Sequence, residues 1–159
     1  MERTSRQRLV RARPLVRAQY DDQRMEESAT AMPKEFARRL LVHVTAVSKP
    51  ASGDTSAACR ICEELRVPLG KMLGVEGFRS LLSRAQVLAS ADIPWLKALV
   101  IEQDGSLTGM RERRLKLDAR ATVDGELALV GHLLALLVVF IGPALTLRLL
   151  HDVWPDWTV

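Results

Sequence analysis

Residues 127–147, LALVGHLLALLVVFIGPALTL, run for 21 positions without a charged side chain. A helix of this length is long enough to cross about 30 Å of hydrocarbon, so the run predicts either a membrane span or the central helix of a soluble bundle. Gly142 and Pro143 interrupt it, because the residue before a proline avoids the α region and proline has no amide hydrogen to donate. A helix that ends there covers residues 127–141, about 22 Å, which is too short to span.

The residues around the run bear on the same choice. His132 would lie inside the membrane, and Arg148 alone follows the run as a cationic anchor. In favour of a membrane, transmembrane helices tolerate glycine and proline, and Trp154 and Trp157 would suit its interface. We expect residues 127–141 to form the central, nearly wholly apolar helix of a soluble domain. A single tail anchor over residues 127–147 remains the alternative.

The segments upstream are amphipathic and need a surface to pack on. Pro33 at a first helical position predicts a helix over 34–48, with a buried stripe of Phe36, Leu40, Val44 and Val47. A second helix, capped by Asp54 or Thr55, would bury Ala58, Ile61, Cys62 and Leu65. We expect Pro68 to kink or end this second helix and Gly74 to be a C-terminal helix stop. A third helix over 75–90 would bury Phe78, Leu81, Leu82, Ala85 and Leu88.

The chain between residues 91 and 126 is less regular. Asp92 is the expected N-cap of a short helix with Pro94 in its first turn. A Val-Ile pair and a DG turn predict a small β-hairpin near 99–109, and the charged residues 111–124 predict a surface connection. The predicted fold class is therefore all-α: a compact bundle of about five helices over 34–159 with a small β-hairpin appendage.

The positive charge of the 159-residue chain is concentrated at its start. Residues 1–20 hold six arginines and one acid, whereas the remaining residues hold 17 Lys and Arg against 18 Asp and Glu. This pattern therefore predicts that residues 1–33 form a flexible basic N-terminal arm. The arm is either a solvated terminus or a contact for nucleic acid or anionic lipid. The candidate anionic-partner contacts are Arg3, Arg6, Arg8, Arg11, Arg13 and Arg17. Met25 and Met32 offer alternative translational starts.

No catalytic constellation is recognisable in the sequence. Cys59 and Cys62 have the spacing of half a zinc site or a redox pair, but no second pair of ligands accompanies them, so two small residues on a packed helix face are the favoured interpretation. There is no GxSxG, no Walker A loop and no GxGxxG. We therefore assign no catalytic, metal or cofactor-binding residue and expect no cofactor. The balance leans against an enzyme without excluding one.

Three stretches carry a family resemblance: RVPLGKMLGVEGFRSLLSRA at 66–85, IPWLKAL at 93–99 with the DGSL turn, and FIGPALTLRLLHDVW at 140–154. Over about residues 56–155 the chain resembles small uncharacterised bacterial proteins of no assigned activity. The resemblance implies a bacterial, cytoplasmic protein and implies no site.

The functional expectation follows from many helix-borne apolar residues and from the lack of convergent polar groups. We expect a non-enzymatic protein-interaction or regulatory module that docks a helical surface on a protein partner or on itself. Two alternatives stay open. One is a tail-anchored membrane protein with a cytoplasmic helical domain, and the other is a nucleic-acid-associated protein that uses the arm.

Overall fold

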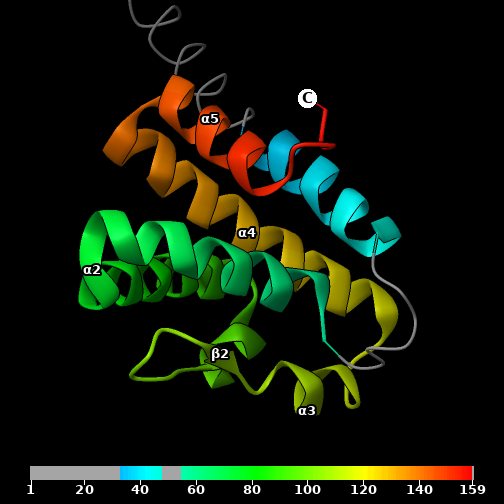
Figure 1. Cartoon of the computed structure of the whole chain (residues 1–159). Coiled ribbons are helices and arrows are strands. Elements are labelled where there is room, and N and C mark those ends of the chain that lie inside the picture. Colours follow the sequence, from blue (N-terminus) through cyan, green and yellow to red (C-terminus); the bar gives the residue numbers. More distant parts are fainter. Residues whose placement is uncertain (1–32, 48–54, 159) are drawn as a thin grey trace, which may run out of the picture. The chain divides into compact units, whose positions relative to one another are not determined.

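Helices dominate the computed structural model, which describes residues 33–47 and 55–158 (Figure 1). The fold class predicted for the body, a bundle of about five helices with a two-stranded hairpin, is confirmed, while residues 1–32 of the arm lie outside the described residues. The elements are a helix at residues 33–47, α2 (Ala57–Asp92), η2 (Pro94–Ala98), β1 (Val100–Ile101), β2 (Leu107–Thr108), α3 (Met110–Arg114), α4 (Ala119–Ile141) and α5 (Pro143–Val153).

α2 is two helices joined at one residue. Gly74 has φ 76° and ψ 166°, a conformation essentially restricted to glycine, and it is the sole non-helical residue between Ala57 and Asp92. The stop predicted at Gly74 is therefore confirmed. Of the two outcomes predicted at Pro68, a kink or an end, the end is wrong, because α2 continues through Pro68, whose missing amide removes one hydrogen bond. The N-cap is Ser56 instead of Thr55: its side chain accepts a hydrogen bond from the Cys59 amide, while Asp54 lies outside the described residues.

α4 and α5 are joined in the same way. Gly142 has φ 83° and ψ 162°, nearly the angles of Gly74, and Pro143 opens α5 at a position where a missing amide hydrogen costs nothing. The predicted helix end before Gly142 is confirmed. The helix begins earlier than residue 127, because the Asp118 carboxylate accepts a hydrogen bond from the Ala121 amide at 2.7 Å and caps the first turn.

Side chains of α2 fasten the irregular region between α2 and α3, and Gln86 makes the two shortest of these hydrogen bonds. The Gln86 side-chain amide donates to the carbonyl oxygens of Leu96 and Leu99, both at 2.8 Å, and so holds the middle of η2 and its C-cap residue. The cap of η2 is Ile93 without a side-chain bond, so the cap predicted at Asp92 is wrong: Asp92 is the last residue of α2. The hairpin pairs Val100 with Thr108 and Ile101 with Leu107.

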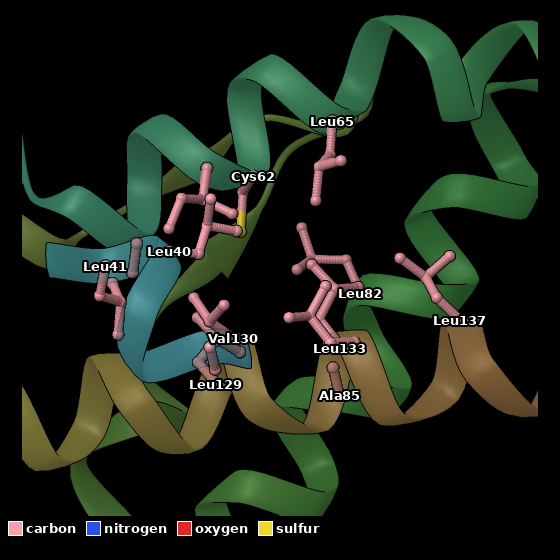
Figure 2. Close-up of a cluster of buried hydrophobic side chains, with 14 of the residues drawn as sticks. Leu40, Leu41, Cys62, Leu65, Leu82, Ala85, Leu129, Val130, Leu133 and Leu137 are labelled. Carbon is pink, nitrogen blue, oxygen red and sulfur yellow. The ribbon is translucent and has the colours of Figure 1, made fainter. Parts of the chain in front are cut away.

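The core lies between α4, both halves of α2 and the helix at residues 33–47. Figure 2 shows leucines from all four segments pointing into one cluster, in which Cys62 takes the place of an aliphatic side chain. The buried residues labelled there are Leu40, Leu41, Cys62, Leu65, Leu82, Ala85, Leu129, Val130, Leu133 and Leu137.

Two of the predicted core positions depart from the expected stripes. Val47 is 64% exposed at the end of its helix, because the helical period marks a face but not how far along the helix the neighbours reach. Leu88 is half-buried, although Ala89 and Ser90 after it are buried. After α5 the chain returns to the bundle, where Trp154 and Trp157 are buried and the Trp157 ring meets Phe36 edge-on at 6.1 Å.

Candidate functional site

Exposed apolar residues lie beside both glycine turns, the one within α2 at Gly74 and the one between α4 and α5 at Gly142. Leu73 and Val75 flank Gly74, and Phe140 and Leu145 lie close to Gly142; all four are exposed. Turns in soluble proteins are usually polar, so large apolar side chains at both are unusual. We call this surface the apolar end and define it by its exposed large residues, Met72, Leu73, Val75, Val139, Phe140 and Leu145.

A shared groove joins the two turns. Leu73, Gly77 and Leu81 of α2 and Phe140 of α4 line a hollow of about 320 Å³, with Ser80 and Arg84 completing its lining. Gly77 permits the narrow approach of the two α2 segments, because a Cβ there would lie 2.9 Å from Leu73 Cβ. The apolar end is therefore concave between its two protruding turns, which is the shape that receives a side chain from a partner.

The charges around the apolar end are mostly positive. Over residues 67–84 and 136–148 the chain carries Lys71, Arg79, Arg84 and Arg148 but only one acid, Glu76, which pairs with Arg79 at 2.9 Å. The chain beyond residue 20 is nearly neutral as a whole, so this end is more basic than the rest of the body. Such a surface attracts negative charge and repels positive charge.

Residues 127–141, the expected central helix of the domain, are not buried over their whole length. Leu133, Leu134 and Leu137 are fully buried, but Val139 and Phe140 are 80% and 69% exposed. α4 is long and apolar enough to cross a membrane by length and composition, and 44% of its most apolar window is buried. The helix thus packs as a core element over most of its length and presents its last turn as surface.

A second, polar hollow lies at the start of α4. It measures about 470 Å³ and is bordered by the helix at residues 33–47, the beginning of α2, the end of α3 and the first two turns of α4. Glu126 lies in its wall and is only 8% exposed. Burial raises the pKa of the Glu126 carboxyl, an effect opposed by a hydrogen bond from Ser56 and by the charge of Arg114. Sequence reasoning missed this acid, although it shares a helical face with Leu129 and Leu133.

The cysteine pair belongs to the core. Cys62 is buried and Cys59 half-buried, and burial raises the pKa of both thiols above the ordinary value. The thiolate is the reactive form, so both thiols are poor nucleophiles and poor ligands at neutral pH. Within residues 33–47 and 55–158, no group of three or more His, Cys, Asp or Glu side chains is arranged to hold a metal ion.

The six arm arginines, Arg3, Arg6, Arg8, Arg11, Arg13 and Arg17, lie outside the described residues, so their contact with an anionic partner stays a prediction.

No family model matches the chain, and neither the curated proteins nor the solved structures contain a match to it. The resemblance to small bacterial proteins, and the cytoplasmic location it implies, therefore stay predictions.

Proposed function

We propose that this chain is a non-enzymatic interaction module that docks through its apolar end on an acidic amphipathic helix of a protein partner. The observation that carries the proposal is the exposure of Leu73 and Phe140 on the two sides of one apolar groove. An amphipathic helix inserts apolar side chains at three- and four-residue spacing into such a groove. Its acidic flanks would face Lys71, Arg84 and Arg148.

The charge argument selects among the occupants of the groove. A second copy of the chain in a two-fold dimer would bring two basic rims together, which is unfavourable. The Arg-rich residues 1–20 have the same sign as the rim and are unfavourable for the same reason. An acidic helix satisfies both the apolar groove and the cations around it, and is therefore the occupant we propose.

A designed peptide tests this proposal. The probe is a fluorescent peptide of about 18 residues with leucines at helical i, i+3, i+4 and i+7 spacing and glutamates elsewhere. We expect full-length protein to bind it with a Kd on the order of 10 µM in a fluorescence-anisotropy titration. Phe140→Ser should weaken binding at least about tenfold, as expected of a central aromatic anchor.

The chain offers a matched control for this experiment. Leu115 is 79% exposed, follows α3 and is not among the groove-lining residues, so Leu115→Ser makes a comparable change in exposed apolar area away from the groove. It should bind the peptide like the wild type. Arg84→Glu should weaken binding, and a peptide with lysine in place of glutamate should fail to bind. Equal affinity of wild type and Phe140→Ser would rule out the groove.

Membrane attachment is the second candidate, and it is supported by the length and apolar character of α4 and by its exposed last turn. The burial of Trp154 and Trp157 argues against it, because a tail anchor would use these rings at the bilayer interface. Carbonate extraction of full-length protein separates the candidates: retention in the membrane pellet supports an anchor, whereas recovery in the soluble fraction removes it.

A further inference from the structure

The polar hollow at the start of α4 carries two opposite charges that do not pair. Glu126 lies in its wall and Arg114 in its lining, and the two interact electrostatically. Both residues are described, and neither has an ion-pair partner within 4 Å. A buried carboxyl group without a cation beside it is costly for a protein to keep. Arg114 is exposed and Glu126 borders the hollow, so both groups are open to a molecule that reaches them.

The hydrogen bonds around Glu126 leave its acceptor capacity largely unused. The Ser56 hydroxyl oxygen accepts a hydrogen bond from the Cys59 amide at 3.1 Å, and the Ser56 hydroxyl donates a hydrogen bond to the Glu126 carboxyl. One hydroxyl hydrogen fills one of about four acceptor positions on a carboxylate. Glu126 can thus accept further hydrogen bonds from an ammonium group inside the hollow.

Two further hydroxyl groups of the walls are already engaged. The Thr45 hydroxyl donates to the Leu41 carbonyl at 2.7 Å, and the Thr122 hydroxyl donates to the Asp118 carbonyl at 3.0 Å. Leu117 and Val123 add aliphatic surface to the same hollow. Apart from Glu126 and Arg114, the walls of the hollow thus consist of hydroxyl-bearing and aliphatic side chains. Its volume of about 470 Å³ falls in the range of small-molecule sites.

We propose that this hollow binds a small zwitterion of the aliphatic α-amino-acid class, with its ammonium group on Glu126 and its carboxylate on Arg114. The aliphatic side chain would lie against Leu117 and Val123. Arginine suits the carboxylate because its guanidinium offers parallel donors to both oxygens. The site is separate from the groove at Phe140, because Phe140 lies 14 positions after Glu126 in α4, about 21 Å along the helix.

A titration with leucine and two truncated analogues tests the proposal. Full-length, ¹⁵N-labelled protein is titrated with L-leucine, with 3-methylbutylamine, which lacks the carboxylate, and with 4-methylpentanoate, which lacks the ammonium group. We expect saturable amide shifts around the hollow with leucine, and at least about tenfold weaker binding of each analogue, because each leaves one protein charge unpaired.

Variants of Glu126 and Arg114 test which protein charge binds each end of the ligand. Glu126→Gln keeps the size of the side chain and Arg114→Gln removes the guanidinium, and each should weaken leucine binding at least about tenfold. The matched control is Arg113→Gln, one residue away and outside the lining of the hollow. It should bind like the wild type, and unaltered amide spectra of the free variants will show that all three fold.

Three results would overturn the assignment. The first is the absence of saturable shifts up to about 20 mM leucine, where a site of millimolar Kd is filled. The second is undiminished leucine binding by Glu126→Gln or Arg114→Gln. The third is an amine or carboxylate analogue that binds as well as leucine, which would make this a site for a single charge. None of them bears on peptide binding at the apolar end.

Discussion

The indole ring of Trp95 lies directly against the backbone of α4 at Gly125, where a Cβ atom would be 2.1 Å from Trp95 Cζ2. Real Cβ contacts are never this short, so the ring and the helix approach each other only because residue 125 has no side chain. This contact joins η2 to α4 and closes the core on the side of the hairpin.

Gly125→Ala should therefore destabilise the fold. Overpacking of this kind costs about 1–3 kcal/mol, against which a glycine-to-alanine change in a helix gains up to about 1 kcal/mol. Gly131 is the matched control, because it is buried in the same helix and its Cβ would meet no atom closer than 3.8 Å. We expect Gly125→Ala to be less stable than Gly131→Ala by at least about 1 kcal/mol in urea denaturation followed by circular dichroism. Equal midpoints would contradict the close approach.

The two single-residue turns should respond alike to substitution. Gly74 and Gly142 share a backbone conformation that side-chain-bearing residues avoid, so Gly74→Ala and Gly142→Ala should each cost about 1–3 kcal/mol. Gly70 lies within the first half of α2 with nothing within 4 Å of its would-be Cβ, and Gly70→Ala should be neutral or stabilising. Thermal unfolding of the three variants checks this. A stable Gly142→Ala protein would mean that α4 and α5 join in some other way.

Glu126 should make stability depend on pH. Its pKa in the folded state is raised above the ordinary value of 4.5, so the folded protein binds the proton more tightly than the unfolded chain does. The protonated carboxyl therefore contributes to the free energy of unfolding. This contribution is fully present below pH 4.5 and is lost as the pH rises through the folded-state pKa. Glu126→Gln mimics the protonated form and should gain stability relative to the wild type as the pH rises from 4 to about 7.

Urea denaturation at several pH values provides the measurement for Glu126. Leu115→Ser removes no titratable group, so its difference from the wild type should stay constant over the same range. A constant difference for Glu126→Gln as well would show that the carboxyl is not perturbed by burial.

The two thiols should react slowly and in sequence. Both have raised pKa values, and Cys59 is half-buried while Cys62 is almost fully buried. In native protein at pH 7, Ellman's reagent should label Cys59 first and Cys62 only through unfolding. The Cys59→Ala and Cys62→Ala variants assign the two phases, and both thiols should react rapidly in urea. Rapid labelling of native Cys62 would contradict its place in the core.

The sequence predicted local features of this fold better than the ends of its buried surfaces. Gly142 and Pro143 act on their own backbone, so the break between α4 and α5 could be inferred without knowing what packs nearby. Pro68 does not end α2, because the packing of the rest of the helix tolerates one absent hydrogen bond, and this packing is not visible in the local sequence.

Exposure depends on neighbours far away in sequence. Leu133, Leu137 and Phe140 share one helical period, yet Phe140 is exposed because it lies beyond the last buried turn. Glu126 was missed because an acid on an apolar face is unexpected until Ser56 and Arg114 are brought to it by the fold. The candidate surfaces thus depend on tertiary packing that one-dimensional patterns do not record.

The matching turns at Gly74 and Gly142 restrict how this fold could vary among descendants of the same gene. Loops ordinarily absorb insertions and deletions, but a hinge of one residue has no slack, and a single added residue would rotate the following helix by about 100°. Changes in chain length should therefore gather elsewhere, for example at the exposed tip of the hairpin around residues 102–104.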